Sequence, residues 1–153
     1  MNKNKGFTLI ELLVVIAIIA ILALVVMSTI TNTKSKANNN AIKSGLNEVR
    51  TQADLFYSSS GVYTNVCSTQ SDTATPKGIN KMILDTGSKN GFSGPVNVNG
   101  NGSSLIRCND SKEAWAAEIP LKNNGGYYCV DHTRKGIVTE TSITSGGNYA
   151  YCR

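Results

Sequence analysis

The chain has 153 residues with a formal net charge of +5, and 41% of them are apolar against 16% charged. These proportions argue against a disordered chain, and the presence of one long apolar run argues against a polytopic membrane protein. Residues 7–27 hold 19 apolar positions out of 21, whereas only 42 of the 126 residues from Ser28 to Arg153 are apolar. The length leaves room for one domain after the run.

The amino terminus combines a basic start, Lys3 and Lys5, with the apolar run and one carboxylate inside it, Glu11. A secretory signal peptide would need a shorter apolar stretch and a small-residue cleavage site. A simple membrane anchor fits the length, because about 20 apolar residues span the hydrocarbon core. Neither interpretation explains why a charge stands near the start of the run.

The stretch Lys5-Gly6-Phe7-Thr8-Leu9-Ile10-Glu11, followed by Leu12-Leu13-Val14-Val15-Ile16-Ala17, resembles the class III signal of type IV pilins and related pseudopilins. The resemblance implies that a membrane prepilin peptidase cleaves between Gly6 and Phe7. It also implies that Phe7 becomes the N-methylated first residue and that Glu11 is the glutamate needed for assembly. Residues 1–6 would then be the leader.

The physical chemistry of Glu11 agrees with that role. A carboxylate in an apolar helix is costly unless it lies at the interface or has a partner. In the family's filaments the partner is the positive amine of a neighbouring subunit, here Phe7. A carboxylate that only reaches the lipid headgroups is the alternative.

The helical pattern continues beyond the apolar run. We expect residues 7–30 to form a transmembrane or filament-core helix and residues 31–58 to form its amphipathic half, with one apolar stripe made of Ile42, Leu46, Val49, Ala53 and Phe56. No proline or glycine lies between Phe7 and Ser44. Gly45 marks either a bend or a close contact.

Residues 59–153 predict a turn-rich head, which makes the fold class α+β, with a long helix packed on a small antiparallel sheet as in pilins. After a connecting loop we expect a three-stranded sheet and a carboxyl-terminal loop closed by a disulfide. The sheet, laid on the amphipathic stripe, is expected to bury Trp115, Ile119, Tyr128, Val130 and Val138. The expected elements are a short helix at Ile79–Leu84 and strands at Trp115–Leu121, Gly126–Asp131 and Gly136–Glu140.

The four cysteines all follow the apolar run, which fits two disulfides in an oxidising compartment and places the head outside the membrane. Three pairings are possible. We favour Cys67–Cys108 with Cys129–Cys152, because these two loops do not overlap. The cysteine spacing and the single histidine, His132, argue against zinc, so no metal and no cofactor are expected.

We identify no enzyme pattern. His132 beside Asp131 falls in a predicted turn without a nucleophile nearby, which favours an exposed turn histidine. The aromatic residues Tyr127, Tyr128, Tyr149 and Tyr151 fit sheet and tail packing better than ligand stacking. The basic residues are scattered, as on a solvated surface.

The function implied by the resemblance is a structural subunit of an extracellular type IV pilus, a filament that serves cell adhesion and twitching motility. Its partners would be further copies of the chain, the prepilin peptidase, a cytoplasmic assembly ATPase and an inner-membrane platform. The subunit would lie in the membrane before assembly and in the surface filament afterwards. A type II secretion pseudopilin is the first alternative, disfavoured because the tail lacks an acidic calcium loop. A competence pilin that binds DNA is the second, and a surface ligand is also possible.

Overall fold

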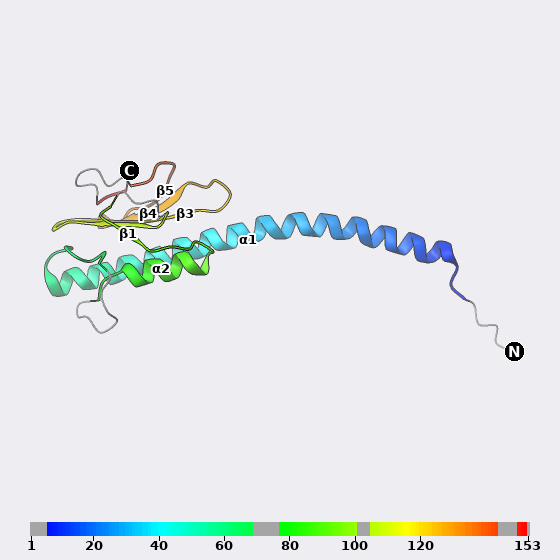
Figure 1. Cartoon of the computed structure of the whole chain (residues 1–153), viewed down its shortest axis with the longest axis horizontal. Coiled ribbons are helices and arrows are strands. Elements are labelled where there is room, and N and C mark those ends of the chain that lie inside the picture. The colour runs from blue at the N-terminus through cyan, green and yellow to red at the C-terminus, as the bar shows by residue number, and fades with distance from the viewer. Residues whose placement is uncertain (1–5, 69–76, 101–104, 144–149, 153) are drawn as a thin grey trace. The chain divides into compact units, whose positions relative to one another are not determined.

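The computed structural model describes residues 6–68, 77–100, 105–143 and 150–152. Within these ranges the elements are the helices α1 (Leu9–Ser60) and α2 (Asn80–Lys89) and the strands β1 (Asn97–Val98), β2 (Arg107–Asp110), β3 (Trp115–Pro120), β4 (Tyr127–Asp131) and β5 (Gly136–Thr139). Figure 1 labels each of them except β2. The chain divides into an amino-terminal unit, Met1–Lys36, and a head unit, Ala37–Arg153. The expected α+β class, with a long helix and a sheet, is confirmed.

Helix α1 begins at Leu9 and ends at Ser60, two residues beyond the expected end. Its first part is uninterrupted because neither proline nor glycine lies between Leu9 and Ser44. At its end the Ser60 hydroxyl donates to the Phe56 carbonyl at 2.8 Å. Gly61 then adopts a positive φ of 73°, which a glycine tolerates, and its N–H donates to the Tyr57 carbonyl at 2.7 Å.

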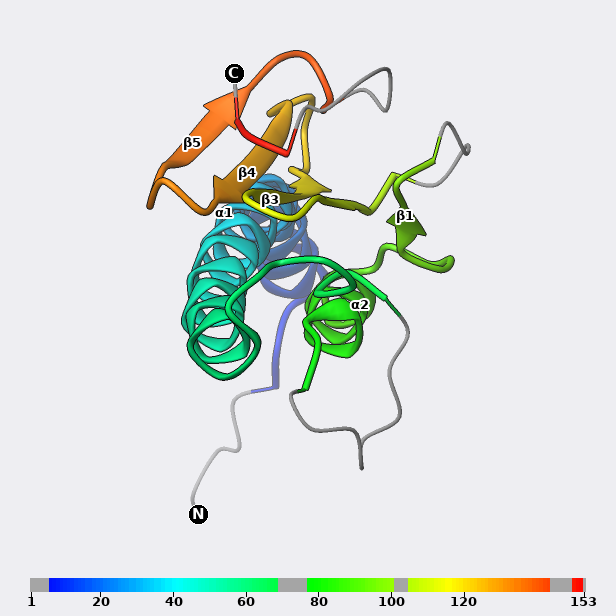
Figure 2. The same cartoon turned by 90° about the vertical axis from the view of Figure 1, so that its left-hand side faces the viewer.

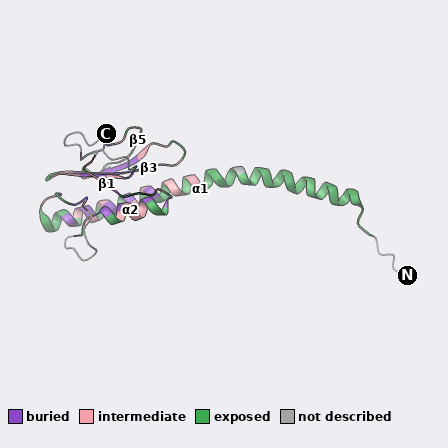
Figure 3. Cartoon of the chain, in the orientation of Figure 1, coloured by how far each residue is buried: buried purple, intermediate pink, exposed green. Residues whose placement is uncertain are grey.

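In the head unit, the apolar stripe of α1 forms the core together with the sheet. Ile42, Leu46 and Val49 have no exposed surface, and neither does Trp115 of β3, the largest of the fully buried side chains. Figure 3 shows this buried stripe in purple along the head part of the helix. The amphipathic pattern read from the sequence therefore describes a real packing face.

The sheet has five strands in the order β1-β2-β3-β4-β5, so the expected three-stranded sheet is wrong. Strands β2 to β5 are antiparallel, as expected, whereas β1 pairs with β2 in parallel. The sequence conceals β2 because Asn109 and Asp110 are poor strand formers. Backbone pairing of all four β2 residues with β3 compensates for this weak propensity.

Helix α2 is longer than the predicted Ile79–Leu84 and continues to Lys89. The added part contains Gly87, a residue of low helix propensity that is buried inside the helix. A Cβ atom there would lie 2.3 Å from Cδ1 of Ile106, so the glycine lets the helix approach the chain that leads into β2. Close packing overrides low helix propensity at this position.

Val138 was expected in the core but is 53% exposed. It pairs with the buried Tyr128, but β5 is the edge strand of the sheet. Its neighbours Ile137 and Thr139 point to the opposite face, where Ile137 packs on a second cluster of buried residues and Thr139 is itself buried. The alternation was read correctly, and the edge position explains the exposure.

Gly45 brings α1 against α2, which run side by side beneath the sheet in Figure 2. A Cβ atom on Gly45 would lie 2.6 Å from Cγ2 and 2.7 Å from Oγ1 of Thr86. The Thr86 hydroxyl is also engaged, because it donates to the Met82 carbonyl at 2.8 Å. Of the two roles considered for Gly45, the close contact applies.

Gly45→Ala is therefore expected to destabilise the head by about 1–2 kcal/mol, since overpacking exceeds the gain in helix propensity. In a Thr86→Ala background the clash is absent, and Gly45→Ala should become neutral or stabilising. Urea unfolding of the full chain in detergent micelles measures both effects. A Gly45→Ala penalty that is unchanged by Thr86→Ala would contradict the contact.

Candidate functional site

The start of α1 is closed by a reciprocal capping box between Thr8 and Glu11. The Thr8 backbone N–H and hydroxyl both donate to Oε2 of Glu11 at 2.8 Å, and the Glu11 N–H donates to the Thr8 hydroxyl at 3.3 Å. Such a box satisfies donors that a helix end leaves without partners. Glu11 is thus oriented towards the chain that precedes the helix. The sequence analysis did not predict that Thr8 caps the helix.

Gly6, Phe7 and Thr8 precede the first helical residue and are exposed. Phe7 is 86% exposed, and apart from the residues next to Gly6 in the chain, no atom of the described residues lies within 4 Å of the position a Cβ would take on Gly6. The peptide bond between Gly6 and Phe7 is therefore accessible in the single chain. Lys3 and Lys5 lie outside the described residues.

The apolar part of α1 has no cover in the single chain. Every residue from Phe7 to Met27 is exposed, and the large apolar side chains range from 48% exposed at Val15 to 86% at Phe7. By length and composition this helix could cross a membrane. Such a surface requires lipid or other apolar helices around it.

Comparison with known proteins agrees with this geometry. Residues 1–27 match the family model described as the prokaryotic N-terminal methylation motif. No curated protein and no solved structure matches the chain.

The match covers the first 27 of the 153 residues, that is, the leader region and the first part of α1. The matched motif is the class III prepilin signal found in type IV pilins and pseudopilins, and in this amino-terminal part the chain is similar to those proteins. Processing by a prepilin peptidase and assembly into filaments follow from this motif in general terms.

The carboxyl-terminal segment lies on the sheet face opposite α1. Ile143 and Cys152 pack there against Ala116 and Cys129, and Cys129 forms a disulfide with Cys152. The second disulfide, between Cys67 and Cys108, lies in the core on the helix side. One crosslink thus fastens the loop after α1 and the other fastens the tail.

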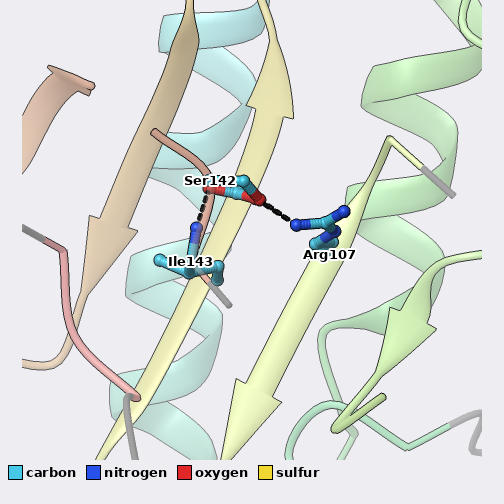
Figure 4. Close-up of polar contacts among 4 residues, drawn as sticks. Arg107, Ser142 and Ile143 are labelled. Atoms are coloured by element: carbon cyan, nitrogen blue, oxygen red, sulfur yellow. Dashed lines mark hydrogen bonds and ion pairs between the residues drawn. The ribbon is translucent and has the colours of Figure 1, made fainter. Parts of the chain in front are cut away.

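A buried carboxylate, Glu118 of β3, holds the start of this tail at Ser142 and Ile143, which Figure 4 labels together with Arg107. Glu118 has no exposed surface, and its Oε1 lies 3.8 Å from Nη1 of Arg107. It accepts the Ile143 N–H at 2.8 Å and the Ser142 hydroxyl. Burial raises the pKa of Glu118, and the contacts with Ser142, Ile143 and Arg107 oppose that rise. The sequence signal for this residue was a single charge in an apolar strand, and it was missed.

The raised pKa of Glu118 should make the unfolding free energy depend on pH. Because the folded-state pKa exceeds the unfolded one, the protonated carboxyl contributes stability below the unfolded-state pKa. This contribution is lost as the pH rises through the folded-state pKa. Relative to Glu118→Gln, the unfolding free energy of the wild type should therefore fall from acidic towards neutral pH.

Urea titrations at several pH values measure that difference. Glu113→Gln is the matched control, because Glu113 is exposed and its profile should run parallel to that of the wild type. Parallel profiles for Glu118→Gln as well would contradict the buried-carboxyl interpretation.

The histidine and the tyrosines that the sequence analysis considered lie in surroundings that suit a structural role. His132 is half-buried, its N–H donates to the Trp115 carbonyl at 3.1 Å, and its ring lies 6.3 Å from that of Tyr63. Tyr127 is half-buried, Tyr128 is buried and Tyr151 is 37% exposed, while Tyr149 lies outside the described residues. Among the described residues, no group of three His, Cys, Asp or Glu side chains could hold a metal ion.

Proposed function

We propose that the chain is a structural subunit of an extracellular type IV pilus. The observation that carries this proposal is the class III signal directly before a helix whose apolar surface is bare on every side. A membrane alone would accept that surface, but it would not need Glu11 in the first turn. A filament core of packed helices needs both.

The proposed assembly has three steps. Residues 7–30 lie in lipid until the peptidase removes residues 1–6 and the amine of Phe7 is methylated. The apolar helices of successive subunits then pack together, and the Glu11 carboxylate pairs with the Phe7 amine of a neighbour. The capping box supports this step, because it already holds the carboxylate near the future amino terminus.

The proposed partners are further copies of the chain, the prepilin peptidase, an assembly ATPase and an inner-membrane platform. In the filament, residues 31–58 and the head from residue 59 would form the outer layer. The disulfides Cys67–Cys108 and Cys129–Cys152 would fasten that layer outside the cell, where thiols are oxidised.

Amino-terminal mass spectrometry of fibres sheared from the cell surface tests the proposal. We expect a chain that begins at methylated Phe7 to be the dominant component. An intact Met1 in purified fibres would overturn the proposal. A processed chain that remains in the cell envelope without long fibres would instead support a secretion pseudopilin.

Salt-dependent retention of those fibres on double-stranded DNA would identify a competence pilin, because phosphate contacts weaken steeply with salt. Scattered basic residues give no reason to expect it.

A further inference from the structure

The sheet carries the same short pattern twice, a cysteine followed two residues later by an aspartate. It occurs in β2 as Cys108-Asn109-Asp110 and in β4 as Cys129-Val130-Asp131. Residues two apart in a strand point to the same face, so each aspartate stands beside its cysteine. Each of these cysteines is the strand member of one disulfide.

In the first disulfide the incoming cysteine is Cys67, from the segment after α1. Its backbone N–H donates to Oδ2 of Asp110 at 2.9 Å. Asp110 is fixed by the side chain of Asn99, whose Nδ2 donates to Oδ1 of Asp110 at 2.5 Å and whose Oδ1 accepts the backbone N–H of Asp110 at 2.8 Å. Both carboxylate oxygens of Asp110 therefore accept hydrogen bonds.

In the second disulfide the incoming cysteine is Cys152, from the tail. Its backbone N–H donates to Oδ2 of Asp131, again at 2.9 Å. Asp131 is 1% exposed, and its Oδ1 accepts the N–H of Thr133 at 2.9 Å and the hydroxyl of Thr133 at 2.7 Å. The two sites lie on opposite faces of the sheet and share one arrangement.

A hydrogen bond to the backbone N–H of the incoming cysteine fixes the position of its Cα atom, from which the thiol side chain extends. The Cα–Cα distances are 5.6 Å for Cys67–Cys108 and 5.8 Å for Cys129–Cys152, within the range that a disulfide spans. Without a guide, closing chain separations of 41 and 23 residues costs entropy, and four cysteines allow three pairings. We propose that Asp110 and Asp131 are positioning residues for disulfide formation, each docking the incoming cysteine beside its partner and so selecting the pairing.

The chemical step is ordinary thiol–disulfide exchange with a protein or glutathione disulfide as oxidant. One cysteine thiolate attacks the oxidant, forms a mixed disulfide and releases one thiol. The second cysteine then attacks the mixed disulfide and releases the other thiol. Two protons and two electrons leave the cysteine pair, and the oxidant becomes two thiols.

The test is redox equilibration of the full chain in detergent micelles with reduced and oxidised glutathione, followed by trapping and peptide mass spectrometry. Asp131→Asn should lower the effective concentration of the Cys129/Cys152 pair about tenfold and leave the Cys67/Cys108 pair within about twofold. Asp110→Asn should do the reverse. In asparagine an NH2 group takes the place of one carboxylate oxygen of aspartate. Asparagine therefore presents donors where that oxygen accepts a hydrogen bond, and it cannot replace either aspartate fully.

The matched control is Asp85→Asn, the same substitution at an aspartate of α2 whose carboxylate pairs with Lys81 at 3.5 Å. It should not change either pair. In the double variant Asp110→Asn/Asp131→Asn, non-native pairings should appear.

The proposal is supported if each variant weakens only the disulfide whose aspartate was replaced. It is overturned if each variant weakens both disulfides equally, or if neither variant weakens a disulfide. Faster disulfide formation or a higher effective concentration of the cysteine pairs in the asparagine variants would also overturn the proposal. That result would mean that each carboxylate acts only on the acidity of the thiol, where its negative charge hinders formation of the thiolate. If Asp131→Asn does not fold, Asp110→Asn still decides by the same criteria.

Discussion

Glu11→Ala is expected to yield a chain that is cleaved and inserted into the membrane but polymerises poorly. Removing one partner of a buried ion pair leaves the other uncompensated, at a cost of about 3–5 kcal/mol. In a filament that cost recurs at every subunit, so few fibres should form. The measurement is the ratio of sheared fibres to cell-bound processed chain, with mass spectrometry to confirm that the chain begins at Phe7.

Two further variants separate the pairing role of Glu11 from its role in the capping box. Glutamine at position 11 can still complete the box, because glutamine serves at this position as glutamate does, but it carries no charge. Thr8→Val removes the hydroxyl of the box and keeps the charge. Pairing predicts few fibres for Glu11→Gln and many for Thr8→Val, whereas capping alone predicts the reverse. Normal fibres from Glu11→Gln would exclude the pairing role.

The sequence predicts the long helix and its two halves because the spacing of the apolar residues indicates each half without reference to tertiary contacts. An apolar run must be covered by something apolar, and a stripe such as Ile42, Leu46 and Val49 must face a core. The methylation motif adds Gly6, Phe7 and Glu11 through local sequence alone. The helix and its buried stripe are confirmed because they depend on neighbours in the chain, whereas cleavage between Gly6 and Phe7 and the assembly role of Glu11 stay predictions.

The missed features depend on distant partners. Strand β2 pairs with β3 despite its polar residues, and Gly87 stays helical because Ile106 packs against it. Neither partner can be read from the local pattern. The aspartates of the two Cys-X-Asp segments could have been found as a repeat, but their contacts with Cys67 and Cys152 come from the fold.

Glu11 and Glu118 illustrate the difference. Each is a single carboxylate in an apolar element, and the same rule assigns each a partner. For Glu118 the fold supplies Arg107, Ser142 and Ile143 within the chain. For Glu11 the described residues supply Thr8, on an exposed helix end, and we propose a charged partner in a second subunit.

The packing of the head on the helix predicts a second large effect. Leu46 has no exposed surface and belongs to the core that α1 shares with the sheet, so Leu46→Ala should lower the unfolding free energy by about 2–5 kcal/mol. Urea unfolding of the full chain in micelles measures this. Trp115 is the only tryptophan and is buried in the same core, so its fluorescence reports on the head.

Leu55→Ala is the matched control, because it is the same substitution on the same helix at a side chain that is 58% exposed. Its effect should stay within about 0.5 kcal/mol. The contrast isolates burial from helix propensity, since both positions exchange leucine for alanine inside α1. Equal losses at Leu46 and Leu55 would mean that micelle or subunit contacts, and not the sheet, stabilise this half of the helix. A large loss at Leu46 alone would show that the second half of α1 depends on its packing against the sheet for its stability.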